Sequence, residues 1–312
     1  MSERKRFSLL YDDSMKEGSS KEMKIEAKQI IVPKNLEFEP KKRYRCTQIG
    51  VTKMLDEVTF SSNIKTQYLL SKSENSGYFH TLLEDYVFTV DPIAMNSVLE
   101  ALKPVEFIRN DIQFSQSEDA RIASILNFKQ LQRRWKKFRD VELLEKEFYQ
   151  KLKENSELAA KNFIQLHDIE FASVDNMKKV IDRNLFHHVL LRSNANASQY
   201  RWSQLSQLFP NMMLNIDVER HTVSEDELTT VYRLVGKLNR TNLDNKHLLS
   251  LYNEYYKPLL KFSYTEFDCI YRVVYTLDNE TNMLIDAQFS MSEKIKNNYE
   301  SITQFDIKTV EL

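Results

Sequence analysis

The chain has 312 residues, 42% hydrophobic and 29% charged, a composition typical of a soluble globular protein and unlike that of a disordered or fibrous one. Its 44 basic and 45 acidic side chains nearly cancel, so its charge gives no support to a general affinity for nucleic acid or for an anionic membrane. This length allows one large domain or two of ordinary size.

The N-terminal residues lack the pattern of a targeting segment. The short apolar patch at Phe7–Tyr11 ends at Asp12 and Asp13, whereas a secretory signal contains an apolar run of about 7–15 residues. No stretch approaches the roughly 20 apolar residues that span a bilayer. We therefore expect a soluble cytoplasmic protein.

Cysteine and glycine are both scarce. Cys46 and Cys269 lie in strand-like stretches, where we expect two buried free thiols, the alternative being a disulfide that joins the two strands. There are only four glycines, and the motifs GxGxxG, GxxxxGK[ST] and GxSxG are missing. Because phosphate-cradling loops need clustered glycines, the classical nucleotide-binding and α/β-hydrolase sites are excluded.

The strongest structural signal is that of a long β-hairpin at residues 58–90. The first arm alternates between apolar and polar residues, the period of a strand with one buried face. The second arm has one apolar parity, but its other parity is mixed, because it contains Phe79, Leu83 and Val87. The turn between the arms, Ser73–Gly77, ends in glycine, as hairpin loops of three to five residues require. One parity of the arms comprises Val58, Phe60, Ile64, Tyr68 and Leu70, then Tyr78, Leu82, Tyr86, Phe88 and Val90.

Shorter elements are predicted on both sides of the hairpin. Before it, residues 1–40 should form a flexible lead-in with a short edge strand at Ile30–Val32, and Arg43–Met54 a first strand. After it, a helix should begin at Asp91 and stop before Pro104. Strands are then expected at residues 105–114 and 120–127.

The middle of the chain is predicted to be mainly helical. Residues 128–192 carry apolar side chains at spacings of three and four, and Ser156 and Ser173 look like helix caps. After a break at 194–198, Ser198 should cap a helix at 199–209. The rest of this region is predicted to form a strand at 212–219, a helix opened by the capping box Ser224–Glu227 and reaching Leu238, and a helix at 245–256.

The C-terminal residues return to the strand pattern. Strands are predicted at 271–277, 283–291 and 302–312, and the last could lie at a sheet edge. The sequence thus predicts an α+β fold in which two long antiparallel meanders form one curved, half-barrel-like sheet around a helical insertion. We expect residues 41–312 to be a single domain, the alternative being two α+β domains at 41–193 and 199–312.

No catalytic, metal-binding or cofactor-binding residue can be assigned. The six histidines include no pair at the i,i+3 or i,i+4 spacing of helical metal sites, and HExxH is missing. His188 lies on an apolar stripe with Ile181 and Leu185, which favours a core histidine. We therefore expect no metal and no cofactor.

One run of basic residues, at 129–139, stands out. Acidic residues follow it directly, so a solvated helix face is favoured over a docking surface for an acidic protein, and nucleic acid comes third. The residues of this predicted basic face are Arg133, Arg134, Lys136 and Lys137.

These observations favour a non-enzymatic binding or assembly protein that acts through contacts with a protein partner or with itself. The first alternative is a carrier of a hydrophobic small molecule between the curved sheet and the helices, and the second is an enzyme with a dispersed site that uses His187 or His188. The residues predicted to face such a ligand are Phe60, Ile64, Tyr68, Ile285, Phe289 and Met291.

Overall fold

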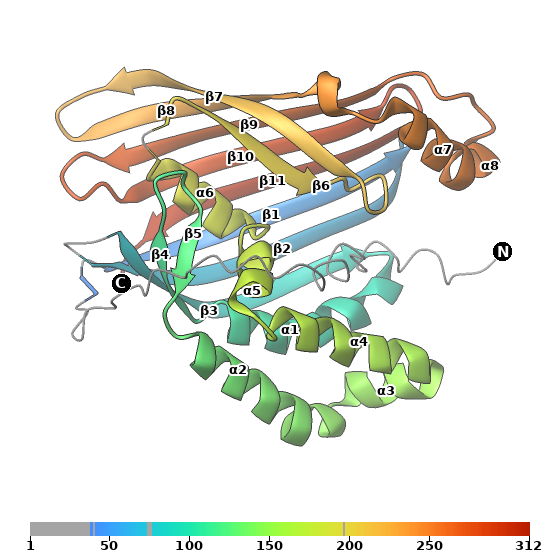
Figure 1. The fold of residues 1–312 in the computed structure, drawn as a ribbon, viewed down its shortest axis with the longest axis horizontal. Coiled ribbons are helices and arrows are strands. Elements are labelled where there is room, and N and C mark those ends of the chain that lie inside the picture. The colour runs from blue at the N-terminus through green and yellow to red at the C-terminus, as the bar shows by residue number, and fades with distance from the viewer. Residues whose placement is uncertain (1–37, 40, 74–76, 196) are drawn as a thin grey trace, which may run out of the picture.

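The first and last of the described strands pair with each other at the centre of one sheet. Strands β1 (Lys41–Met54) and β11 (Tyr299–Val310) run antiparallel, in register from Arg43 opposite Val310 to Met54 opposite Tyr299. The computed structural model describes residues 38–39, 41–73, 77–195 and 197–312 (Figure 1). The predicted lead-in and its edge strand at Ile30–Val32 lie outside these described residues, apart from Phe38 and Glu39.

All eleven described strands belong to this open antiparallel sheet, in the order β5-β4-β3-β2-β1-β11-β10-β9-β8-β7-β6. The predicted α+β fold with one curved sheet is confirmed. The remaining strands are β2 (Glu57–Lys72), β3 (Tyr78–Asp91), β4 (Ile112–Gln116), β5 (Ile122–Ile125), β6 (Gln199–Leu205), β7 (Met213–Glu225), β8 (Thr229–Leu238), β9 (Phe267–Asp278) and β10 (Leu284–Ile295).

The expectation that the last strand lies at an edge is wrong. The edges of the sheet are β5 and β6, while β11 is paired on both sides by β1 and β10. Two long unpaired edges would expose rows of backbone donors and acceptors, and pairing β1 with β11 removes both.

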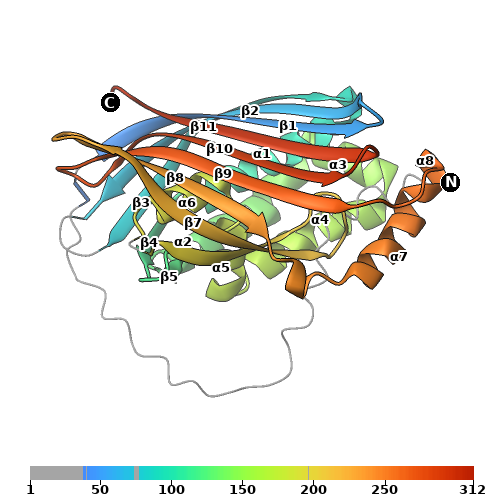
Figure 2. The same cartoon turned by 90° about the horizontal axis from the view of Figure 1, so that it is seen from above.

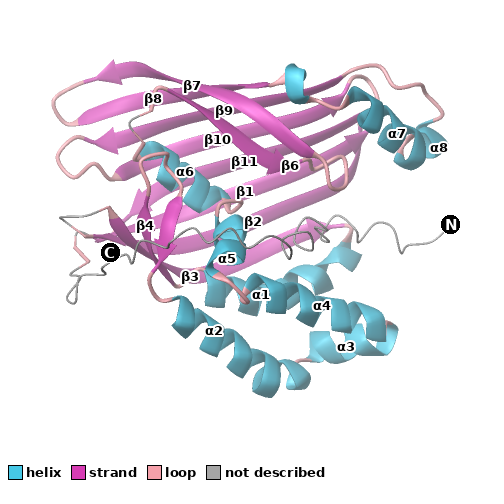
Figure 3. Ribbon diagram, in the orientation of Figure 1, coloured by secondary structure: helices cyan, strands magenta, loops and turns pink. Residues whose placement is uncertain are grey.

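The helices lie on one side of the sheet, which is its inner, concave side (Figures 2 and 3). Short 3-10 or π turns occupy Ile93–Met95, Phe138–Glu142, Leu143–Glu145 and Arg240–Asn242. The α-helices are α1 (Asn96–Arg109), α2 (Phe128–Lys137), α3 (Glu147–Asn155), α4 (Glu157–Glu170), α5 (Val174–Ile181), α6 (Leu185–Ser193), α7 (Asn245–Tyr255) and α8 (Lys257–Leu260).

Several local predictions are confirmed. The hydroxyl oxygens of Ser156 and Ser173 accept hydrogen bonds from the backbone N–H groups of Ala159 and Asn176, at 3.2 and 3.1 Å, so both serines cap helices. Cys46 and Cys269 are buried free thiols.

The strand predicted at residues 105–114 is wrong for most of its length. Helix α1 continues through Pro104 to Arg109, and only from Ile112 does a strand follow. The buried side chains Ala101, Val105 and Ile108 recur at spacings of four and three, the period of a helix that buries one face. This burial outweighs the loss of one backbone hydrogen bond at the proline.

Two predicted helices are strands instead. Residues 199–209 contain β6, and residues 224–238 contain the turn between β7 and β8 and then β8 itself. The side chain of Asp226 accepts hydrogen bonds from the backbone N–H groups of Leu228 and Thr229, at 2.8 and 2.7 Å. Asp226 therefore stabilises a hairpin turn rather than a helix start.

Candidate binding site

The inner face of the sheet is divided into a part covered by other elements and a part that is less covered. We call the inward side chains of β8–β11 the filled half. The open half consists of the inward side chains of β1 from Gln48 to Thr52, of β2 from Phe60 to Ile64, and of β3 from Phe88 to Val90. Cross-strand register joins the two, since Phe289, Phe305, Gln48, Ile64 and Phe88 lie in one continuous row across five strands.

Helix α6 packs against the filled half. The ring of His188 lies 4.2 Å from that of Trp202, and its Nε2 is 2.9 Å from the hydroxyl of Tyr271. The ring of Phe289 contacts that of Tyr271 edge to face at 5.5 Å. Aromatic side chains of a helix, an edge strand and two central strands thus fill the space above the sheet.

A loop between β6 and β7 covers the rest of the filled half. The carboxylate of buried Glu293 accepts hydrogen bonds from the Ser206 hydroxyl at 2.5 Å and from the backbone N–H groups of Gln207 and Leu208 at 2.9 and 3.4 Å. Burial raises the pKa of Glu293 to about 7, although these donors act in the opposite direction. Glu293 therefore holds the loop on the sheet.

The open half begins where this loop ends. The side chain of Gln207 accepts a hydrogen bond from Ser301 at 2.6 Å and donates one to Thr303 at 3.0 Å, both on β11. Beyond this loop, the inward side chains of β1, β2 and β3 from Gln48, Ile64 and Phe88 onward are half-buried. No helix of the described chain stands in front of the right-hand parts of β1 and β2 (Figure 1), whereas α1 packs against β3. The lining residues are Gln48, Gly50, Thr52, Phe60, Ser62, Ile64, Phe88 and Val90.

The lining of the open half combines apolar surface with polar groups. The half-buried side chains of Gln48 and Ser62 have no hydrogen-bond partner in the part of the chain that the structure describes. A mainly apolar surface with a few convergent polar groups is typical of a binding site.

The six residues predicted to face a ligand are divided between these regions. Tyr68, Phe289 and Met291 are buried in the core, whereas Phe60 and Ile64 line the open half. Ile285 is half-buried at a β-bulge, where Leu284 takes the inward position. Sequence reasoning left Phe88 and Val90 out of this set, although both share the parity of Tyr86.

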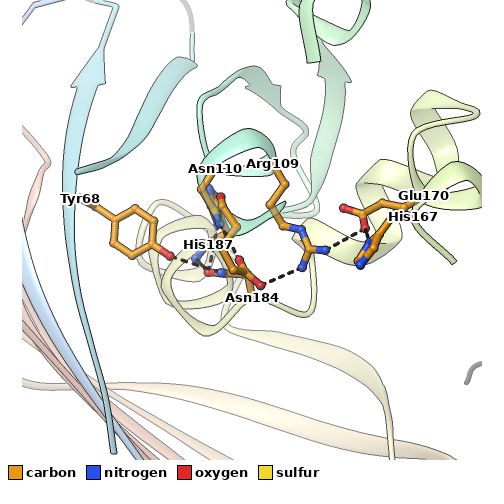
Figure 4. Close-up of polar contacts among 8 residues, drawn as sticks. Tyr68, Arg109, Asn110, His167, Glu170, Asn184 and His187 are labelled. Carbon is orange, nitrogen blue, oxygen red and sulfur yellow. Dashed lines mark hydrogen bonds and ion pairs between the residues drawn. The ribbon is translucent and has the colours of Figure 1, made fainter. Parts of the chain in front are cut away.

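A polar network lies between α1, α4 and the start of α6, on the side of buried Tyr68 (Figure 4). The guanidinium group of Arg109 donates to the carboxylates of Glu106 and Glu170, at 2.9 and 2.8 Å, and Nδ1 of His167 is 2.9 Å from Glu170. Burial alone would raise the pKa of Glu170, but Arg109 and His167 outweigh it and hold the pKa below its ordinary value. Glu170 is therefore ionised and only 3% exposed, which suits an ion pair between helices better than acid–base chemistry.

His187 and His188 are equally inaccessible. Nε2 of His187 is 2.9 Å from the hydroxyl of Thr81, and Nδ1 is 3.1 Å from the side-chain oxygen of Asn184. Burial lowers the pKa of His187 to about 3 and that of His188 well below its ordinary value. Both rings are neutral groups of the core, so neither carries the enzyme alternative.

The predicted basic face is only partly available for docking. Arg133, Lys136 and Lys137 are exposed on α2, but Arg134 donates to Asp111 at 2.5 Å. Oδ1 of Asp111 also lies 2.8 Å from Nε2 of His80, so Arg134 belongs to a local polar cluster.

The described residues offer neither a metal-binding cluster nor a membrane-spanning helix. They contain no group of three or more histidine, cysteine, aspartate or glutamate side chains placed to bind a metal. None of the helices in the described ranges is long and apolar enough to cross a membrane.

Comparison with models of protein families finds no match to this chain, and comparison with curated proteins finds no similar sequence.

Proposed function

We propose that this is a non-enzymatic binding protein that receives an apolar segment of a partner protein on the open half of its inner face. The observation that carries the proposal is the set of half-buried apolar side chains, Phe60, Ile64, Phe88 and Val90, on a face whose other half is covered. A sheet normally buries such a face against another layer.

The dimensions support a helical segment. Three strands about 4.8 Å apart give a floor about 10 Å wide between the outer strands, and a helix with its side chains is about 10–12 Å across. Helix α6 lies on the same sheet in the filled half. An amphipathic helix of a partner would bury the open half in the same manner.

Two matched variants test this proposal. Phe88 faces inward, and Val87, its neighbour in the chain, faces outward and is 51% exposed. Each is changed to aspartate in tagged full-length protein, and capture from native lysate is compared with that of the unchanged protein. We expect Phe88→Asp to lose a protein that Val87→Asp retains, and a photo-crosslinking residue at Ile64 to attach to that protein. Equal capture by both variants would contradict the proposal.

The second candidate is a carrier of a hydrophobic small molecule, favoured by the polar groups of Gln48 and Ser62, which have no hydrogen-bond partner among the described residues and lie among apolar side chains. Native mass spectrometry of gently purified protein distinguishes the two. A bound small mass that disappears in Phe88→Asp would favour the carrier over the protein receptor.

A further inference from the structure

We infer that the outer face of the sheet, along β9, β10, β11 and β1, is the surface through which two copies of this chain associate. This inference concerns the opposite face from the open half and does not depend on what the open half binds. In such a dimer both inner faces would point outward, so each open half would stay accessible.

The outer face has no covering layer among the described residues, since the helices lie on the other side (Figure 2). It carries exposed apolar side chains, including Ile270 at 47% and Val274 at 38% exposure on β9. Two shallow grooves run along β10 and β11, and Gln288 and Asp306 line both of them. The face is therefore neither covered nor uniformly polar.

The charges on the two central strands are arranged in opposite order. On β10, Lys294 lies toward one end of the sheet and Asp286 toward the other. On β11, the opposing residues are Glu300 and Lys308. Laying β10 of one copy on β11 of a second copy, with a two-fold axis parallel to the strands, places Lys294 against Glu300 and Asp286 against Lys308. Symmetry repeats each contact, so four complementary pairs form.

The same axis also matches the flanking strands. Cross-strand register puts Ile270 of β9 and Val51 of β1 in one row, so these two apolar side chains meet between copies. A two-fold axis across the strands would also place Lys294 against Asp286 and Glu300 against Lys308. It is less favourable, because it brings Arg272 against Arg272 of the second copy and Lys53 against Arg45. Charge therefore selects one of the two face-to-face arrangements.

These charges are not already paired with each other inside the chain. Within the described residues there is no ion pair between Lys294 and Glu300 or between Asp286 and Lys308, although each pair faces across two neighbouring strands. Glu300 instead accepts a hydrogen bond from Ser292 at 3.0 Å, and Asp286 accepts one from Thr276 at 3.2 Å. All four charged side chains therefore remain available to pair with those of a second copy.

The area is adequate for a specific dimer. Four strands about 4.8 Å apart and about ten residues long cover roughly 650 Å². Because the outer face is the convex one (Figure 2), the strands beyond these four curve away from the second copy. A standard interface buries about 800 Å² per partner.

The test uses charge reversal and mixing of full-length variants, with mass measured by light scattering after size exclusion at protein concentrations up to about 100 µM. The unchanged protein should be dimeric. Lys308→Glu alone should be monomeric because the introduced glutamate meets Asp286, and Asp286→Lys alone should be monomeric because the introduced lysine meets Lys308. An equimolar mixture of these two variants should regain the dimer mass, since both contacts are then between opposite charges.

The mixture separates contacts between copies from contacts inside one chain, because neither variant chain contains both changes. Lys129→Glu on the exposed surface of α2 is the matched control and should remain dimeric. A monomer at every concentration, a dimer that survives Lys308→Glu, or a mixture that stays monomeric would each overturn the inference. Circular dichroism of every variant checks that the fold is kept.

Discussion

The filled and open halves of the inner face share one sheet and differ in what lies above them. Phe289 and Phe305 in the filled half are 3% exposed, whereas Ile64 and Phe88, in the same row of the sheet, are half-buried. The strands alternate in the same way in both halves. The difference therefore arises from the segments that cross the face, namely α6 and the β6–β7 loop.

This contrast indicates which residues maintain the fold and which are free to serve binding. A side chain in the filled half contacts a helix, a loop and its sheet neighbours, so its replacement should mainly change stability. A side chain in the open half contacts fewer groups, so its replacement should mainly change binding.

The largest expected effect comes from a matched pair of phenylalanines. Phe289→Ala should lower the free energy of unfolding by about 3–5 kcal/mol, because it leaves a cavity beneath His188 and Tyr271. Phe60→Ala should cost below about 1.5 kcal/mol, since its side chain is only half-buried. Urea unfolding measures both, with Phe289→Leu as a milder variant if the alanine variant does not fold. Similar losses at the two positions would show that the open half is packed as well as the filled one.

The second prediction concerns the ion pairs that Glu170 makes with Arg109 and His167 in the helical layer. Glu170→Gln should lower the free energy of unfolding by about 3 kcal/mol, because it leaves buried His167 and part-buried Arg109 with less compensation. Glu157→Gln, at the exposed start of the same helix α4, should have no measurable effect. Binding to the open half should persist in Glu170→Gln under conditions where the variant is folded, which would separate the role of this network from that of the site.

The sequence predicted which side chains face inward, but not which distant segments cover them. Alternation placed Tyr68, Phe289 and Met291 on the inner face, and serine caps located α4 and α5. It could not see the bulge that displaces Ile285, because the register of β9 and β10 depends on both strands. Nor could it pair Arg109 with Glu170, 61 residues apart, or decide that β1 and β11 would be neighbours. These are choices between distant segments, whose free energies depend on packing rather than on local pattern.

Glu293, which holds the β6–β7 loop on the filled half, should make the free energy of unfolding depend on pH. Its pKa is raised from 4.5 to about 7 in the folded state. Between these values the folded state holds a proton that the unfolded state releases. The contribution of Glu293 to the free energy of unfolding is therefore complete below about pH 4.5 and is lost as the pH rises toward 7, by up to about 3 kcal/mol. Glu293→Gln should remove this part of the slope in urea unfolding between pH 5 and 8. An unchanged slope would mean that the loop donors keep Glu293 ionised throughout.

The smallest effect should come from two glycines that lie in the same row of the sheet, Gly236 in the filled half and Gly50 in the open half. A Cβ at Gly236 would stand 2.6 Å from Cγ2 of Ile216 and 2.8 Å from Cδ1 of Tyr271, so Gly236→Ala should cost about 1–3 kcal/mol through overpacking. At Gly50 the close neighbour is the hydroxyl of Ser62, at 2.8 Å, which can rotate away. Gly50→Ala should therefore cost less than about 1 kcal/mol while narrowing the floor of the binding surface. Thermal unfolding orders the two variants, and a larger loss at Gly50 would mean that the open half is the more rigid of the two.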